Sequence, residues 1–149
     1  MTSTNSAPMN TREFLEVLAD LVRQQLPPEL SDFQTPSRVT SLIKLYYGQP
    51  STHYEVWVQK RRKEVEVGLH FEADPESNFG QLEMLSQRSE EIRASLGPEF
   101  EIGEWDRGWT RAHETVPLEP LDDDFLVELS FKLSAMIRTL EPILRQDSG

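Results

Sequence analysis

The spacing of hydrophobic residues predicts a helix near the start of the chain. Apolar side chains recur every three or four residues from Phe14 to Leu26, which places them on one face of a helix. Asn10 is a favourable N-cap, and Glu13 follows three residues later, as in a capping box. Pro27 and Pro28 are expected to end the helix, because proline removes a backbone donor and clashes with the preceding turn.

The next part of the chain alternates between apolar and polar residues, which is the pattern of strands with one buried face. The predicted strands are Val39–Tyr47, Tyr54–Gln59 and Glu64–Glu72, with a short helix as the alternative for the first. The apolar face of the second and third strands is expected to consist of Val56, Val58, Val65, Val67, Leu69 and Phe71.

A tight turn at Arg61 and Arg62 would join these two strands and fix their register. The expected pairs are Gln59 with Glu64, Trp57 with Glu66, Glu55 with Gly68, and His53 with His70. A slip by one residue would move the glutamates into the apolar layer, so the hydrophobic pattern specifies this register.

A second helix is predicted after a break at Asp74–Ser77, where Asn78 and Gln81 resemble a helix start. Gly97 and Pro98 are expected to end it. Its apolar stripe consists of Phe79, Leu82, Leu85, Ile92 and Leu96.

The remaining sequence predicts a hairpin and a long final helix. The strands Phe100–Glu104 and Trp109–His113 flank a turn at Asp106–Gly108. The final helix begins at Asp122–Asp124, where negative charge is favourable at a helix N-terminus. Its apolar stripe extends past Pro142, which is expected to bend or end the helix.

This order of elements predicts an α+β fold: a helix, a three-stranded antiparallel meander, a helix, a two-stranded hairpin, and a C-terminal helix packed on one sheet. A chain of 149 residues has the size of one domain. We therefore expect a disordered tail at residues 1–9, a single α+β domain at residues 10–145, and a second tail at residues 146–149.

Composition narrows the classes of function. The formal net charge is −11, and the acidic residues are concentrated in the C-terminal third, which disfavours binding to nucleic acid phosphates. The absence of cysteine excludes disulfides, thiolate nucleophiles and cysteine-ligated metals. Neither a membrane-spanning run nor a secretory signal is found, so a cytoplasmic location without membrane contact is expected.

The polar face of the predicted hairpin gathers residue types that bind metals or move protons. It carries His53, Glu55, Trp57, Glu66, His70 and Glu72. Imidazole and carboxylate groups together can bind zinc or another divalent ion, or act as general acid and base. The same side chains would equally suit a sheet face that contacts water, so both interpretations remain open.

Trp57 is the most informative residue of this face, because a large apolar ring is either covered or available to a partner. We expect it to be covered within the chain or by a second subunit. Tyr46 on the preceding strand is expected on the same face.

Lys60–Lys63 is the main basic cluster, and it lies at the predicted hairpin tip. A solvated turn that deters edge aggregation accounts for it, and a phosphate-contacting loop extended by Arg107 and Arg111 is the alternative. The candidate binding residues are therefore Trp57, Tyr46, His53, Glu66, His70, Arg61 and Arg62.

Sequence motifs of common enzymes are not found. The chain has no glycine-rich phosphate loop, no G-x-S-x-G elbow and no nuclease E-x-K strand. No catalytic residue, metal or cofactor is assigned, which favours a non-catalytic role. A metal-dependent enzyme that uses His53 and His70 remains the alternative, together with an accessory nucleic-acid-associated domain.

The order of elements from Asn10 to Arg145, the length and the acidity resemble the small bacterial chaperones of type III secretion. That resemblance is architectural, and no residue motif of the family is matched. It implies a homodimer that holds a segment of another protein, in the manner of a chaperone or adaptor.

A second resemblance rests on residues. Val65–Phe71, Asn78–Leu96, Glu101–Trp105 and the long terminal helix are similar to an uncharacterised bacterial domain family that often sits behind nuclease-like domains. About half the chain is covered. Because the nuclease-like domain is missing, this resemblance implies an accessory or recognition role without activity.

Two substitutions test the assignment of the hairpin faces. Val67→Asp is expected to prevent folding, because it places a carboxylate in the apolar layer. Glu66→Lys on the opposite face is expected to be tolerated within about 1 kcal/mol.

Overall fold

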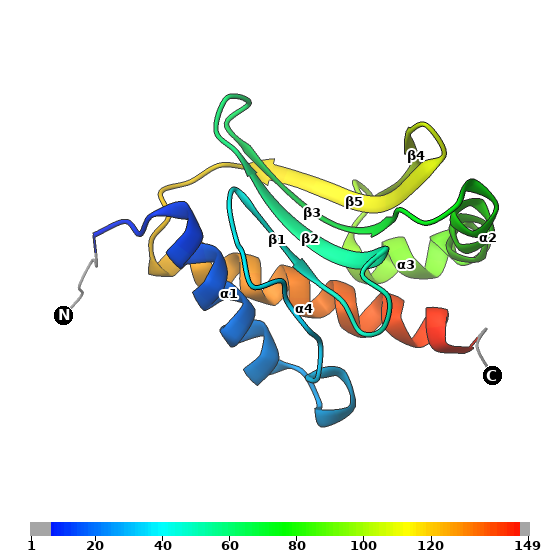
Figure 1. The fold of residues 1–149 in the computed structure, drawn as a ribbon, viewed down its shortest axis with the longest axis horizontal. Coiled ribbons are helices and arrows are strands. Elements are labelled where there is room, and N and C mark those ends of the chain that lie inside the picture. The colour runs from blue at the N-terminus through cyan, green and yellow to red at the C-terminus, as the bar shows by residue number, and fades with distance from the viewer. Residues whose placement is uncertain (1–6, 147–149) are drawn as a thin grey trace.

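The computed structural model describes residues 7–146 and consists of one five-stranded sheet with helices on one of its faces (Figure 1). The helices are α1 (Thr11–Gln25), the short 3-10 helix η1 (Pro28–Leu30), α2 (Pro75–Ser86), α3 (Ser89–Leu96) and α4 (Asp123–Gln146). The strands are β1 (Leu42–Leu45), β2 (Thr52–Gln59), β3 (Glu64–Phe71), β4 (Glu101–Asp106) and β5 (Trp109–Pro117). The expected α+β fold is confirmed.

All strand pairs are antiparallel, and the strands are ordered β1-β2-β3-β5-β4 across the sheet. The four residue pairs expected between β2 and β3 are all present. The register was predictable because only one alignment buries the apolar side chains of both strands together.

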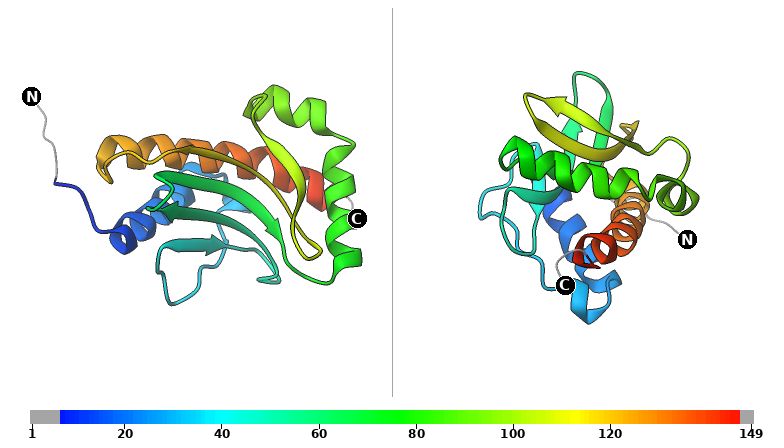
Figure 2. Two further views of the ribbon diagram at one scale, coloured as in Figure 1. Left: turned by 90° about the horizontal axis from the view of Figure 1, so that it is seen from above. Right: turned by 90° about the vertical axis from the view of Figure 1, so that its right-hand side faces the viewer.

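The core lies between the sheet and the helices. The six expected inner-face residues of β2 and β3 are at most 2% exposed. Helix α4 runs along the length of the molecule beneath the sheet, and α1 lies beside α4 (Figure 2). Helices α2 and α3 lie near the C-terminal end of α4. Gln25 joins α1 to α4, because its side chain hydrogen bonds to the hydroxyls of Ser130 and Ser134.

β1 is shorter than the predicted strand Val39–Tyr47. Beyond Leu45 the chain leaves β2, and Tyr46 forms an isolated bridge with Gln34 through two backbone hydrogen bonds. The β-branched and aromatic residues at both ends of this segment have high strand propensity, which made the predicted strand longer. Tertiary contacts determine where the hydrogen bonding between β1 and β2 stops.

The predicted second helix is two helices, and it starts earlier than expected. Asp74 caps α2 by accepting a hydrogen bond from the Ser77 amide, with Pro75 in the first turn. Asn78 lies inside the helix, fully buried, and its amide donates to the carbonyls of Ala73 and Gly108. The expected cap residue therefore anchors α2 to the β4–β5 turn.

The β4–β5 hairpin turns at Arg107 and Gly108, both with positive φ, as a tight two-residue turn requires. β5 extends four residues beyond the predicted end at His113, because it pairs with β3 as far as Pro117. The pairing with β3 was not visible in the local sequence.

Helix α4 continues through Pro142 to Gln146, so the proline does not end the helix. Proline removes only one backbone donor, and the helix continues for one further turn beyond it. At the other end, Asp122 accepts a hydrogen bond from the Phe125 amide, which confirms the expected acidic start.

The described fold extends past the expected domain limits of residues 10 and 145. The Met9 amide donates to the Leu121 carbonyl and its side chain packs against the core, so the domain begins before Asn10. Gln146 belongs to α4, whereas residues 1–6 and 147–149 of the expected tails lie outside the described residues. Within residues 7–146, no helix combines the length and the hydropathy needed to cross a membrane.

Candidate functional site

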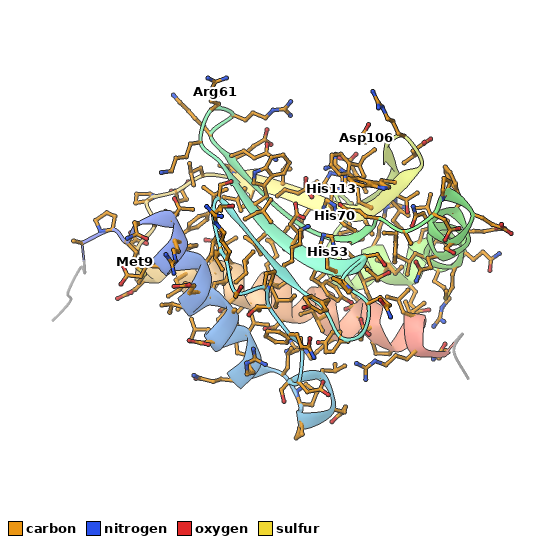
Figure 3. All side chains as sticks on the ribbon, in the orientation of Figure 1. Met9, His53, Arg61, His70, Asp106 and His113 are labelled. Atoms are coloured by element: carbon orange, nitrogen blue, oxygen red, sulfur yellow. The ribbon has the colours of Figure 1, made fainter. Side chains whose placement is uncertain are left out.

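The outer face of the sheet, opposite the helices, carries two adjoining features. The first is a buried group of side chains that we call the His–Glu cluster: His53, Glu55, Glu66, His70 and Glu72. The second is an open hollow near the β2–β3 turn, which reaches beyond the outer face to Thr11 at the start of α1. Figure 3 places His53, His70 and His113 one after another across β2, β3 and β5, with Arg61 at one hairpin tip and Asp106 near the other.

The interpretation of this sheet face as exposed to water is wrong where the cluster lies. The side chains of His53 and His70 are fully buried, and Glu66 is 1% exposed. A β-bulge between Glu104 and Asp106 disrupts β4. The Trp105 ring then packs edge-on against His70, with 5.4 Å between ring centroids.

His53 is oriented by the backbone. Its Nδ1–H donates to the Pro50 carbonyl at 2.9 Å, and its Nε2 faces Glu55 Oε1 at 3.1 Å. Because the carbonyl requires the proton on Nδ1, the contact between Nε2 and the carboxylate needs a second proton or a cation.

His70 lies between two carboxylates. Nε2 contacts Glu66, and Nδ1 contacts Glu72 Oε2 at 3.2 Å. Burial alone would lower the pKa of His70, but the hydrogen bonds to Glu66 and Glu72, with the charge of Glu55, outweigh it and raise the pKa to about 9.

Glu66 connects the cluster to β5, because its second carboxylate oxygen pairs with the Arg111 guanidinium. Burial opposes ionisation of Glu66, but the hydrogen bond from His70 and the charges of His70 and Arg111 lower its pKa. Glu72 behaves similarly: burial opposes its ionisation, but His70 and His53 lower its pKa.

The cluster has the composition of a metal centre. His53, Glu55, His70 and Glu72 each offer one ligand atom, and these four atoms lie within 4.8 Å of one another. Imidazole and carboxylate ligands in this combination suit zinc and neighbouring divalent transition metals.

His113 lies beside the cluster without joining it. Burial and the charge of Arg111 lower its pKa, and its buried Nδ1 has no hydrogen-bond partner among the described residues. His113 is the residue paired with Gly68 across β3 and β5.

The hollow, which we call the Trp–Arg groove, has a volume of about 750 Å³. Its lining residues are Thr11, Thr40, Ser41, Trp57–Arg62, Glu64, Glu66, Trp105, Arg111 and Thr115. Four basic side chains against two carboxylates make the groove locally positive on a chain of net charge −11. The Arg111 guanidinium also stacks on Trp105, 4.9 Å from the ring centroid.

The structure divides the predicted binding residues between these two features. Trp57, Arg61 and Arg62 line the groove, and His53 and His70 belong to the cluster. Glu66 belongs to both, because it also lines the groove. Tyr46 belongs to neither: it is not among the lining residues of the groove or the members of the cluster, and its backbone pairs with Gln34.

Sequence reasoning missed Trp105 and gave Arg111 a different role. Trp105 follows the predicted hairpin strand Phe100–Glu104, and nothing in the sequence indicates that a bulge would set its ring against His70. Arg111 was considered for a phosphate-binding ridge, whereas it pairs with Glu66 and stacks on Trp105. The only available signal for the role of Arg111 would have been a glutamate on one predicted strand, Glu66, and an arginine on a later predicted strand that could pair with it.

Comparison with known proteins gives no match to a family model, to a curated protein or to a solved structure.

Proposed function

We propose that this protein is a non-catalytic, homodimeric module that binds a segment of another protein in the Trp–Arg groove. The observation that carries the proposal is the combination of Trp57, Trp105 and a local excess of positive charge in one hollow. Aromatic rings provide apolar contact area, and the cations attract carboxylates. The groove therefore suits an acidic segment that also carries apolar side chains.

Two polar atoms support a hydrogen-bonding occupant. Thr11 Oγ1 and Trp105 Nε1 are buried, belong to residues that line the groove, and have no hydrogen-bond partner among the described residues. An indole N–H is only a donor, so it needs an oxygen acceptor such as a peptide carbonyl or a carboxylate. Leaving such a group unpaired costs about 1–3 kcal/mol, which an occupant would recover.

A protein segment fits better than nucleic acid. The overall charge of −11 repels a phosphate backbone, and Glu64 and Glu66 add negative charge inside the groove itself. A short acidic peptide meets the local positive potential without placing a long polyanion against the rest of the surface.

The dimer is proposed from a different surface. Val127 and Phe131 lie one turn apart on α4 and are 42% and 59% exposed. The same patch on a second copy would cover both residues in a two-fold symmetric contact. Sedimentation velocity at micromolar concentration tests this. A dimer that dissociates in Phe131→Ser is expected, and a strict monomer contradicts it.

Peptide binding is tested by fluorescence anisotropy with labelled peptides of about twelve residues, roughly the length of a groove-bound extended segment. Four peptides are compared, in which glutamate or lysine alternates with leucine or serine. Only the glutamate–leucine peptide should bind in the micromolar range. Equal binding of the lysine peptides, or no binding of any, contradicts the proposal, and preferential binding of a single-stranded oligonucleotide supports the nucleic-acid alternative.

The matched variants are Trp57→Ala and Phe79→Ala. Both remove a large aromatic side chain, but only Trp57 lines the groove, whereas Phe79 is 40% exposed on α2 outside it. Truncation of an aromatic anchor should weaken binding at least about tenfold. Phe79→Ala should leave it unchanged, and equal losses would locate the binding elsewhere.

A further inference from the structure

The open end of the β2–β3 hairpin carries a set of ligands that the proposed groove does not use. His53 pairs with His70 across the two strands, and Glu55 and Glu72 stand two residues further along the chain from each. The turn at Lys60–Lys63 closes the hairpin at its other end. A group bound between the histidines would therefore fasten the end that the turn leaves open.

Several separations between the ligand atoms are close to those around a small metal ion. A tetrahedral zinc ion with bonds of about 2.0–2.2 Å holds its ligand atoms roughly 3.3–3.6 Å apart. His53 Nε2 lies 3.1 Å from Glu55 Oε1 and 3.9 Å from Glu72 Oε2, and His70 Nδ1 lies 3.2 Å from Glu72 Oε2. All four ligand atoms lie within 4.8 Å of one another, so the side chains must draw closer around the ion to complete a coordination shell.

Both histidines also have the outer hydrogen bond that metal-ligating histidines require. The Pro50 carbonyl holds the proton on His53 Nδ1, which leaves the Nε2 lone pair directed at the carboxylates. Glu66, itself held by Arg111, accepts a hydrogen bond from His70 Nε2–H, which leaves Nδ1 beside Glu72. A carboxylate or carbonyl behind each imidazole fixes the ring orientation and raises its basicity as a ligand.

The charge of the surroundings favours a cation. Glu55, Glu66 and Glu72 face Arg111 from β5 and Lys44 from β1, the residue paired with Glu55. With neutral imidazoles, three carboxylates exceed two basic side chains and leave negative charge in a buried position. A bound cation or protons on the histidines must compensate for it.

We propose that His53, Glu55, His70 and Glu72 bind a divalent first-row transition metal ion, with Zn²⁺ as the best fit, in a closed structural centre. Four protein ligands fill a tetrahedral shell, which is the arrangement of structural rather than catalytic zinc sites. The nitrogen ligands select against Mg²⁺ and Ca²⁺, which prefer oxygen. This inference is independent of the proposed peptide binding.

The test is isothermal titration of the chelator-treated protein with Zn²⁺, followed by Co²⁺ and by Mg²⁺ as a negative control. We expect one Zn²⁺ per chain with micromolar affinity or better, visible d–d absorption bands with Co²⁺, proton release on binding, and a melting temperature that rises by several degrees. Absence of Zn²⁺ binding, or equal binding of Mg²⁺, overturns the proposal.

Variants locate the site. Glu66→Gln removes only the outer hydrogen-bond partner of His70 and should weaken Zn²⁺ binding roughly 10- to 100-fold. Glu72→Gln removes a proposed ligand while keeping the shape of a side chain that is 14% exposed, so it should weaken Zn²⁺ binding by at least as much. His113→Asn is the matched control, because it removes the third histidine of the same face and should leave binding unchanged. Trp57→Ala should also leave it unchanged, which separates this site from the groove.

A purely structural ion network gives a different result. In that case Glu72→Gln lowers the melting temperature equally with and without Zn²⁺, and the metal titration shows no binding or binding insensitive to Glu72→Gln. Either outcome refutes the metal centre and leaves the peptide-binding proposal intact.

Discussion

Gly68 lies so close to His113 on the neighbouring strand that a methyl group on Gly68 would stand 2.6 Å from the His113 Cβ. The backbone of Ala112 would be 3.1 Å away, so neither side chain nor main chain offers room. A glycine between Glu66 and His70 thus allows β3 and β5 to approach closely beneath the His–Glu cluster.

Gly68→Ala is therefore expected to destabilise the protein by about 1–3 kcal/mol, because the strands must separate to admit the methyl group. Urea unfolding measures the change. Gly80→Ala is the control, since a methyl group at this helical position meets nothing within 4 Å and should be neutral or stabilising by up to about 1 kcal/mol. A Gly68→Ala variant as stable as the wild type would contradict the close approach.

Val67→Asp is expected to prevent folding. Val67 is fully buried on the inner face, where an aspartate would bring an unpaired carboxylate into the apolar layer between the sheet and α4. Circular dichroism of the purified variant tests this. A cooperative thermal transition near that of the wild type would mean that the inner face can admit a charge.

Glu66→Lys is expected to cost about 3–5 kcal/mol, in contrast to the tolerance that the sequence alone predicted. The lysine ammonium would replace the carboxylate between His70 and Arg111 and leave three cationic or titratable groups together in a buried position. Glu64→Lys on the same face is the control, because Glu64 is only partly buried. Equal melting temperatures for the two variants would contradict the buried network.

The stability of the metal-free protein should depend on pH through His70. Its folded pKa of about 9 lies above the ordinary value of 6.5, so the imidazolium contributes stability that is fully present below pH 6.5 and is lost as the pH rises through 9. Comparison of wild type with His70→Asn between pH 6 and 10 isolates this contribution, because other groups titrate in both proteins. The difference in unfolding free energy should shrink with rising pH, and a constant difference would contradict the raised pKa.

Local patterns in the sequence predicted most of the secondary structure and the register of β2 and β3. Capping by Asn10 and the alternation around Val67 are local signals, and both persist in the fold. The earlier start of α2 was missed because Asp74 and Pro75 provide a stronger helix start than Asn78, whose amide is used for a long-range contact with Gly108.

The candidate site was predictable only in part. The strand period placed His53, His70 and Glu66 on one face, as the structure confirms. Their burial was not predictable, because it depends on a bulge in β4 and on the pairing of β5 with β3. The paired residues of these two strands are far apart in the sequence: Glu66 and its partner Thr115 are separated by more than forty residues. Alternation identifies a face but does not indicate what covers it.

Helix α4 is synthesised after every strand of the sheet whose apolar face it covers. During translation, Val56, Val67 and Leu69 therefore have only α1, α2 and α3 available to shield them until residues 123–146 emerge from the ribosome. A nascent chain in this state has formed its sheet but still exposes part of the apolar face. Such partly folded chains are bound by chaperones, and they aggregate when synthesis stalls. Folding of this domain is consequently completed by its last helix, and premature termination within α4 yields a sheet without its cover.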